Sequence, residues 1–316
     1  MMNGHMKKPY NVAIGQVITG KWHKQRYHIL KQLGEGANGA VYLVDYNGRK
    51  VALKLSDNYA SIASEINVLK SFTKVQGSSL GPYLLHGDDW IQPGRSLPFY
   101  VMEYIQGKDL LIFTQDHGPD WVEIFILQLL SNLDVLHRAG WVFGDLKPEN
   151  LIVTSPDYKV RCVDVGGTTL IGRSVKEFTE FFDRGYWGVG TRVAEPSYDL
   201  FAVAMIFINM HYPKRFHKKG HGQKQLLEIV SQTKGLRRYQ QVLEKAILGK
   251  YATCTEMRED LLHVINHPGT GTRNLSRVTR RKKQKRKKSS VFGEMVLLLV
   301  LLCFLYGLYI YTQILG

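Results

Sequence analysis

Apolar and polar residues alternate through the first third of the chain. The runs HILKQLG and AVYLVDYNGRKVALKL, both within residues 25–55, have the two-residue period of strands, and Asn47-Gly48 is typical of a hairpin turn. LPFYVMEYI (97–105) predicts a further strand. Between these strands, residues 61–72 carry apolar side chains at helical spacing after a capping Ser61. The pattern predicts a small sheet with one helix beside it.

Helical patterns take over in the second half of the chain. EIFILQLLSNLDVLHRAG (123–140) is a strongly apolar helix that ends at a glycine. Two short hydrophobic pieces, at 151–153 and 160–165, precede a mainly helical stretch that ends near Asn266. Because strands come first and helices later, we predict an α+β fold with a small β-rich N-lobe and a larger helical C-lobe.

The C-terminal end carries a long apolar segment. Met295 to Leu315 has no charged side chain, and at ~1.5 Å per residue a helix of this length spans the ~30 Å of a bilayer's hydrocarbon. A buried core helix is the alternative, but VLLLVLLCFLYGLYIY has no polar face. Since positive charges stay inside, the preceding Lys/Arg run predicts a single-pass anchor in the cell membrane with the body in the cytoplasm.

These patterns divide the chain into four segments. We expect an N-terminal extension (1–24), a folded body (25–266), a disordered basic juxtamembrane linker (267–290) and a transmembrane helix (291–316, with its core at about 295–315). The three cysteines show neither CxxC nor metal-type spacing, which is typical of a reduced, cytosolic body.

The net charge of +15 is concentrated near the C-terminus. Residues 273–288 hold ten Lys and Arg, and Glu294 is the one charge after them, so 10 − 1 = +9 belongs to this end and +6 to the rest. The run is interpretable as a stop-transfer flank, a patch for anionic lipid or an arm for non-specific DNA binding. No aromatic residues interleave, so base stacking is not predicted. The side chains that would contact DNA or lipid are Arg280, Arg281, Lys282, Lys283, Lys285, Arg286, Lys287 and Lys288.

A second group of basic residues follows the predicted helix that contains Asp199. A solvated surface is its ordinary interpretation, and docking of acidic substrates or of DNA is the functional one. The group comprises Lys214, Arg215, Lys218, Lys219 and Lys224.

A glycine-rich turn lies between two predicted strands. Residues 34–41 read G-x-G-x-x-G-x-V, with Gly34, Gly36, Gly39 and Val41, and such a turn lets backbone amides approach phosphate oxygens closely. Alone the motif is weak, because dinucleotide sites and flexible hairpins share its glycines. Its place between strands, rather than before a helix, argues against a dinucleotide site.

A lysine follows on the next predicted strand. A lysine within an apolar strand, such as Lys54 in VALK, is normally an edge residue whose ammonium lies in water. Because Lys54 follows a glycine loop, it can instead contact two phosphates. It then needs an acidic partner, and Glu65 on the next helix is the candidate, although an isolated Glu65 would more often be a surface residue.

The most specific motif is FGDLKPEN (143–150). Asp145 followed five residues later by Asn150 places a carboxylate beside an accepting hydroxyl and an amide toward a metal ion, while Lys147 reaches the transferred phosphate. Asp164, in DVG, adds a second carboxylate for Mg²⁺, a cation that prefers oxygen ligands. The four elements in this order predict transfer of the ATP γ-phosphate.

Residues 25–266 resemble the bacterial eukaryotic-like (Hanks-type) serine/threonine protein kinases. The resemblance implies the bilobal protein-kinase fold, ATP and Mg²⁺ as cofactors, and Asp145 as the catalytic base. It also implies that Asn150 and Asp164 hold the metal and that Lys147 indicates serine or threonine as acceptor. The nucleotide-site residues that it implies are the gatekeeper Met102, the hinge residues Glu103 and Ile105, and Val41, Ala52 and Ile152 around the adenine.

The chain departs from the family pattern in ways that bear on regulation. Phe143-Gly144 replaces the usual His-Arg, so no guanidinium is available to receive a phosphorylated activation loop. Ala194-Glu195-Pro196 is interpreted as a scrambled Ala-Pro-Glu, while Asp199 matches the family's buried aspartate. We expect Thr191 to hydrogen-bond near Asp145 and Lys147. The activation-segment hydroxyls are Thr168, Thr169, Ser174, Thr179 and Thr191.

The runs FGDLKPEN, DVGGTT and RVAEPSYDLFAVAMI, with the basic linker and tail helix, are most similar to kinases of spore-forming bacteria that associate with DNA. This resemblance implies a role in sporulation, protein substrates, regulation by DNA and a homodimer for trans-autophosphorylation. The alternatives are a membrane-to-DNA tether with a pseudokinase body and a small-molecule phosphotransferase.

Overall fold

The computed structural model describes residues 10–36, 38–74, 80–212 and 214–267, all within the first of two units into which the chain divides, residues 1–269. The linker and the apolar C-terminal segment, together with the eight residues predicted to contact DNA or lipid, lie outside the described residues. Within the described ranges, no helix is both long and apolar enough to cross a membrane.

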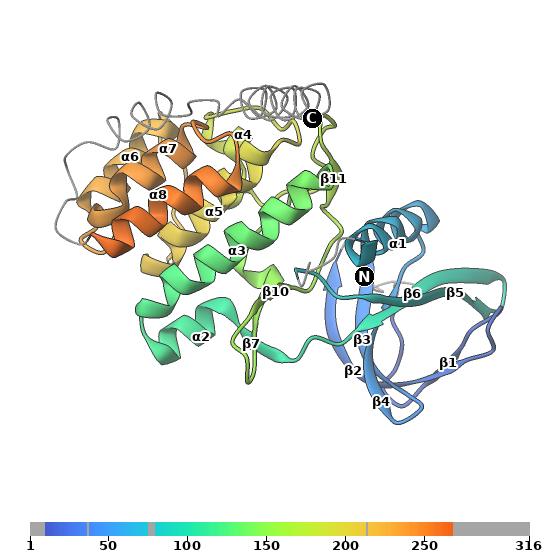
Figure 1. Ribbon diagram of the computed structural model, residues 1–316. Helices are drawn as coiled ribbons and strands as arrows, with labels where there is room; N and C mark the ends of the chain where they lie inside the picture. Colours follow the sequence, from blue (N-terminus) through green and yellow to red (C-terminus); the bar gives the residue numbers. More distant parts are fainter. Residues whose placement is uncertain (1–9, 37, 75–79, 213, 268–316) are drawn as a thin grey trace, which may run out of the picture. The chain divides into compact units, whose positions relative to one another are not determined.

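The N-lobe is built on one six-stranded antiparallel sheet (Figure 1). The strand order is β1-β2-β3-β4-β6-β5, and the strands are β1 (Val17–Thr19), β2 (Arg26–Gly36), β3 (Gly39–Tyr46), β4 (Arg49–Leu55), β5 (Leu84–Gln92) and β6 (Arg95–Glu103). The predicted hairpin at Asn47-Gly48 is confirmed: both residues have positive φ, which that tight turn requires. Helix α1 (Tyr59–Lys74) packs on β5 and β6.

The C-lobe gathers its helices around α5. Figure 1 shows the larger, helical lobe beside the N-lobe, and the predicted unequal lobes are confirmed. Helix α5 is buried on every side from Tyr198 to Asn209, as a helix without a polar face must be. The other helices are α2 (Leu110–His117), α3 (Asp120–Arg138), α4 (Arg184–Trp187), α6 (Gly222–Gln232), α7 (Gln240–Ile247) and α8 (Cys254–Asn266).

Short strands and turns carry the sequence motifs of the C-lobe. Strands β7 (Gly107–Asp109), β9 (Leu151–Thr154) and β10 (Val160–Cys162) form a small sheet, and β8 (Trp141–Val142) pairs with β11 (Thr169–Leu170). Three 3-10 turns complete the lobe: η1 (Pro148–Asn150), η2 (Glu180–Phe182) and η3 (Arg237–Tyr239). The loop 143–150 therefore begins after β8 and ends before β9.

The folded body begins earlier than residue 25, the predicted boundary. Strand β1 pairs with β2, and Tyr10 and Val12 are buried against the sheet. The Tyr42 hydroxyl accepts a hydrogen bond from the Val12 N–H (3.0 Å) and donates one to the Tyr10 carbonyl (2.9 Å). Residues 10–24 are thus part of the N-lobe, because strand pairing and the burial of Tyr10, Val12 and Ile18 tie them to the sheet, while Ile14 and Trp22 stay exposed. The sequence pattern missed them because the segment is short and lacks a clear period.

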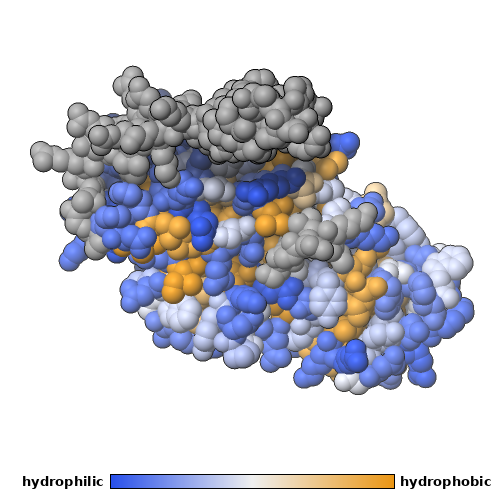
Figure 2. Space-filling view, in the orientation of Figure 1, coloured by the Kyte–Doolittle hydropathy of each residue, from blue (hydrophilic) through white to orange (hydrophobic). Residues whose placement is uncertain are grey.

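Hydrophilic residues cover most of the visible face of the described part of the chain, and hydrophobic ones show in scattered patches (Figure 2). The apolar side chains lie mainly in two clusters, one within the N-lobe sheet and one that runs from the α1 side of the sheet through the C-lobe. The second cluster therefore contains residues of both lobes.

Candidate active site

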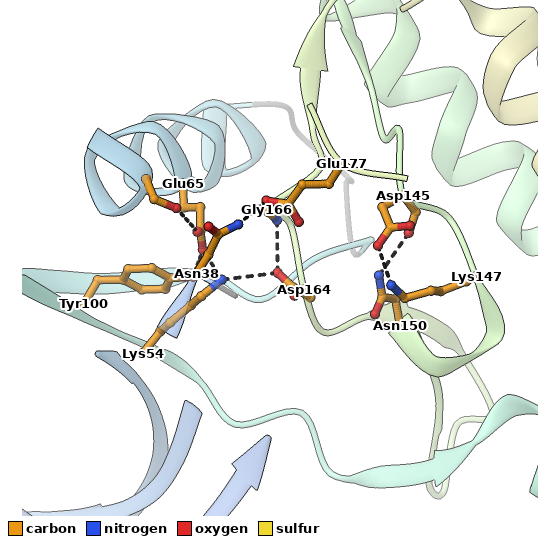
Figure 3. Close-up of polar contacts among 11 residues, drawn as sticks. Asn38, Lys54, Glu65, Tyr100, Asp145, Lys147, Asn150, Asp164, Gly166 and Glu177 are labelled. Carbon is orange, nitrogen blue, oxygen red and sulfur yellow. Dashed lines mark hydrogen bonds and ion pairs between the residues drawn. The ribbon is translucent and has the colours of Figure 1, made fainter. Parts of the chain in front are cut away.

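A buried ion pair connects β4 to α1. The Lys54 ammonium donates to Glu65 at 2.6 Å, and both side chains are almost fully buried (Figure 3). Burial lowers the pKa of Lys54, but the carboxylates of Asp164 and Glu65 outweigh it and the net pKa is raised. The lysine therefore stays charged in the absence of any ligand.

Two further hydroxyls hold Glu65 in place. Tyr100 donates to one carboxylate oxygen at 2.7 Å, and Ser61 donates to the other at 3.0 Å. With Lys54 as a third donor, the carboxylate is fully engaged and its orientation is fixed. Lys54 and Glu65 were predicted from the sequence but Tyr100 was not, because nothing in the strand LPFYVMEYI distinguishes this tyrosine from an ordinary core residue.

The loop between β8 and β9 brings three predicted residues together. The Lys147 ammonium forms an ion pair with the Asp145 carboxylate, and the Asn150 amide donates to the Asp145 carbonyl at 2.9 Å (Figure 3). The 3-10 turn η1, started by Pro148, points Asn150 back toward Asp145. The loop thus presents a carboxylate, an ammonium and an amide on one side of the cleft.

Asp164 follows β10 and faces the same cleft from the other side. Its carboxylate lies 3.5 Å from the Lys54 ammonium and accepts from the Gly166 N–H at 3.0 Å. Although burial raises the pKa of Asp164, Lys54 and that N–H lower it more, so the net pKa lies below the usual value. The carboxylate remains ionised at neutral pH, as a metal ligand must be.

The donor set suits a hard cation that is shared with a substrate. Asp164 and Asn150 line one cleft with the glycine turn and Lys54, and they provide oxygen ligands. Within the described ranges, no three His, Cys, Asp or Glu side chains come together to hold a metal alone. A cation here would therefore take its other ligands from phosphate oxygens and water, which fits a divalent metal bound with ATP.

The glycine turn lines this cleft on the N-lobe side. Gly39 has φ +129°, and a Cβ there would lie 2.3 Å from the Leu55 carbonyl oxygen, so this position requires glycine. Gly34 and Gly36 are exposed at the end of β2. The Asn38 amide reaches across the cleft and donates to Glu177 at 2.5 Å.

An adjoining pocket is lined largely by apolar side chains. It lies beside the strand that ends at Glu103, whose carboxylate pairs with Arg161 at 2.5 Å. The lining includes all of the predicted adenine-site residues: Val41, Ala52, Met102, Glu103, Ile105 and Ile152.

A buried carboxylate anchors the catalytic loop to the core. Asp199 on α5 is fully buried and accepts from the backbone N–H groups of Phe143 (2.7 Å) and Gly144 (3.0 Å). His137 of α3 contacts the same carboxylate at 2.8 Å. These bonds satisfy two backbone donors that would otherwise be buried without partners, and the buried role predicted for Asp199 is confirmed.

Backbone packing explains the glycine at position 144. Gly144 has φ +83°, and a Cβ there would lie 2.6 Å from the Gly167 carbonyl oxygen and 3.4 Å from the Val175 side chain. Arginine is therefore excluded here without a backbone shift. Val175, itself buried, occupies the adjacent space, so an apolar contact stands where the family pattern has a charged one.

The end of the activation segment differs from the prediction. The hydroxyl that lies between Asp145 and Lys147 belongs to Thr179: it donates to Asp145 at 2.9 Å and accepts from Lys147 at 3.1 Å. Thr191 was predicted there but is exposed, and its carbonyl accepts from Arg184 at 2.6 Å.

The prediction for Thr191 was wrong because it rested on a single three-residue motif. Ala194 and Glu195 directly precede α5, and Pro196 is the first residue of that helix. The three residues therefore start the helix and are too close to Asp199 to end the activation segment beside the catalytic loop. Nothing in the sequence marks Thr179 as the residue beside Asp145, because that contact depends on the fold.

Ion pairs within the activation segment stabilise the part of it that precedes α5. Asp183 is buried, caps α4 and pairs with Arg192 at 2.7 Å, and Arg184 pairs with Glu195 at 2.6 Å. Nearer the cleft, Lys176 donates to Ser64 of α1 at 2.8 Å. Burial, followed by the charge of Asp164, raises the pKa of Glu177 above its usual value. None of these pairs was predicted from the sequence, because the partners lack a fixed spacing.

Comparison with known proteins agrees with this geometry. The protein kinase domain family matches residues 27–275. Serine/threonine-protein kinase YabT of Bacillus subtilis is 51% identical over 250 residues, which cover 78% of this chain and 74% of that protein. Human Rho-associated protein kinase 1 is 28% identical over 149 residues, 46% of this chain and 11% of that protein.

The match to the domain family covers well over half of the chain, and the similarity to YabT covers more than two thirds of both proteins. Most of both lobes, the Lys54–Glu65 pair and the loop around Asp145 lie inside the matched region. The chain therefore belongs to the protein kinase family and is an ATP-dependent serine/threonine protein kinase.

Proposed function

We propose that Asp145 takes up the proton of the acceptor hydroxyl while Lys147 neutralises charge on the transferred phosphoryl group. One observation carries this assignment: a hydroxyl, that of Thr179, already lies between the two side chains, 2.9 Å from the Asp145 carboxylate and 3.1 Å from the Lys147 ammonium. The carboxylate thus accepts from a hydroxyl here, which is the geometry a general base needs.

The nucleotide phosphates are expected to lie between the glycine turn and Lys54. The backbone N–H groups of the turn approach phosphate oxygens closely because no side chain intervenes, and the Lys54 ammonium supplies a fixed positive charge. Glu65 holds that ammonium in place through the 2.6 Å contact. The adenine would occupy the apolar pocket lined by Val41, Ala52 and Ile152.

We assign the divalent metal as Mg²⁺, held by Asp164 and Asn150. Two protein oxygen ligands, with the rest from phosphates and water, are typical of Mg²⁺ in phosphoryl-transfer sites. When bound, the ion would neutralise charge on the phosphate oxygens. The low pKa of Asp164 supports the assignment, because its carboxylate needs no deprotonation to bind a cation.

Transfer of γ-labelled phosphate by the full-length chain in detergent tests this function. We expect labelling of Ser or Thr that chelation abolishes and Mg²⁺, but not Ca²⁺, restores. A rate per molecule that rises with enzyme concentration would support trans-autophosphorylation within a homodimer. Absence of labelled protein at every Mg²⁺ concentration would leave a pseudokinase tether as the better description.

Activity is expected not to require a phosphorylated activation segment. Gly144 has no guanidinium to bind a phosphate, Val175 fills the space beside it, and Thr168 and Thr169 are buried. Alanine at Thr168, Thr169, Ser174 or Thr191 should therefore leave phosphorylation of an added protein within about threefold of wild type, with thermal stability measured in parallel. Thr179 is left out because it contacts Asp145. Loss of activity in a stably folded Thr168→Ala or Thr169→Ala variant would contradict this expectation.

We further propose that the C-terminal segment anchors the kinase in the cell membrane with its catalytic body in the cytoplasm. The support is compositional: 21 uncharged residues, 295–315, follow a strongly basic run. Because the folded body carries the active site, the kinase would meet its substrates and any activating signal on the cytoplasmic side of the membrane. Protease protection of residues 1–290 in sealed vesicles of known orientation tests this topology.

We propose that residues 273–288 also bind DNA without sequence preference and that DNA regulates the kinase. Ten basic residues can neutralise phosphates, and log affinity should then fall with log salt at a slope of roughly −0.9 per phosphate engaged. Gln at the eight positions of 280–283 and 285–288 should abolish binding while ATP transfer persists. Wild-type DNA binding by that variant, or a binding constant independent of salt, would contradict the proposal.

A further inference from the structure

A strongly basic loop follows α5. No Asp or Glu occurs between Asp199 and Glu228, whereas Lys214, Arg215, Lys218, Lys219 and Lys224 all lie in that interval. The chemistry described above uses none of the five. They differ in what they contact: Lys218 donates to the Tyr186 carbonyl at 2.8 Å, and Lys224 lies 3.9 Å from Glu228 on its own helix.

Arg215 reaches the catalytic loop. Its guanidinium forms an ion pair with Glu149 and lies 4.9 Å from the centre of the Phe182 ring. Glu149 comes two residues after Lys147, and Phe182 comes three residues after Thr179. Arg215 therefore contacts both of the segments that hold the acceptor position, one through charge and the other through cation–π packing.

The Arg215–Glu149 pair sets the charge beside the acceptor. Glu149 lines the cleft with Asp145 and Lys147, and its side chain is half exposed. An unpaired carboxylate here would attract cationic peptides, but Arg215 neutralises it. The guanidinium has five N–H donors and its side chain is 37% exposed, so it retains donors that can face solvent. Packing on Phe182 fixes its orientation before any ligand binds.

We propose that Arg215 recognises a carboxylate of the protein substrate and that this kinase prefers Ser or Thr with acidic neighbours. This inference rests on the acceptor site proposed above. A planar guanidinium matches a carboxylate with two parallel N–H···O bonds. Because Arg215 contacts residues on both sides of the acceptor position, its guanidinium is within reach of side chains that flank the acceptor hydroxyl.

Three peptides with one central threonine test the proposal. Their flanking residues are acidic, neutral or basic, and kcat/KM is measured for each with the full-length chain in detergent. The wild type should favour the acidic over the basic peptide by about tenfold, and Arg215→Gln should lower that ratio at least about fivefold. Glu149→Gln should raise it, because a competing carboxylate is removed. Lys224→Gln makes the same charge change away from the cleft and should leave the ratio unchanged.

The outcomes separate the preference from the chemistry. If no peptide is phosphorylated, the proposed function itself fails. If all three are phosphorylated equally, or if Lys224→Gln changes the ratio as much as Arg215→Gln, the function stands and the role of Arg215 is wrong. Weaker duplex DNA binding by Arg215→Gln with an unchanged peptide ratio would identify a nucleic-acid surface instead. Should Arg215→Gln fold poorly, Glu149→Gln tests the role of Arg215 instead. A rise in the acidic-to-basic ratio of kcat/KM supports that role, and an unchanged ratio contradicts it.

Discussion

Asp145→Asn is expected to lower γ-phosphate transfer by about 10²- to 10⁴-fold, the usual contribution of a general base. The amide keeps the size of the carboxylate but cannot take up the acceptor proton, and it loses the ion pair with Lys147. Because Asp145 is only partly buried and lies at the cleft, the fold should remain intact. Single-turnover transfer from labelled ATP measures the loss, and thermal unfolding checks the fold.

Asp157→Asn provides a matched control. Asp157 lies in the turn between β9 and β10, is exposed, and pairs with Lys159 at 3.3 Å, so the same chemical change there should leave transfer unaffected. ATP binding should also survive in Asp145→Asn, because Lys54 and the glycine turn are untouched. A wild-type transfer rate in a folded Asp145→Asn protein would refute the role assigned to this residue.

The largest effect on stability is expected from Asp199→Asn. One of the two carboxylate oxygens becomes an NH₂ group that must face a backbone N–H of Phe143 or Gly144, which leaves that donor buried and unsatisfied. The free energy of unfolding should fall by about 2–4 kcal/mol. Since those two residues precede Asp145, transfer should fall as well, even where the variant is still folded.

Chemical denaturation of Asp199→Asn beside Asp116→Asn measures this effect. Asp116 on α2 is half exposed and pairs with Lys108 at 3.2 Å, so its change should shift the unfolding free energy by less than about 1 kcal/mol. Equal stabilities of the two variants would show that the buried carboxylate does not anchor the loop.

The sequence predicted those parts of the site whose residues have fixed spacing. Asp145, Lys147 and Asn150 lie within six residues, so one loop and one 3-10 turn suffice to place them. Lys54 and Glu65 were predictable because a strand followed by a helix leaves few acids within reach of the lysine. The two lobes followed from hydrophobic periods of two and of 3.6 residues, which depend on local burial alone.

The remaining parts of the site depend on tertiary contacts that have no local signal. Thr179 donates to Asp145, which lies 34 residues earlier in the chain, and no local pattern marks that contact. Tyr100 and Arg215 look like ordinary core and surface residues until the fold brings them to Glu65 and Glu149. Residues 10–24 join the sheet through Tyr42, which lies 30 residues away from Val12.

Transfer of the γ-phosphate of ATP to serine and threonine hydroxyls can be tested by phosphoamino-acid analysis after incubation of the full-length chain with γ-labelled ATP, Mg²⁺ and an acceptor protein. We expect labelled phosphoserine and phosphothreonine in the acceptor, and none with Asp145→Asn. Label found only in inorganic phosphate, or only in phosphotyrosine, would contradict it.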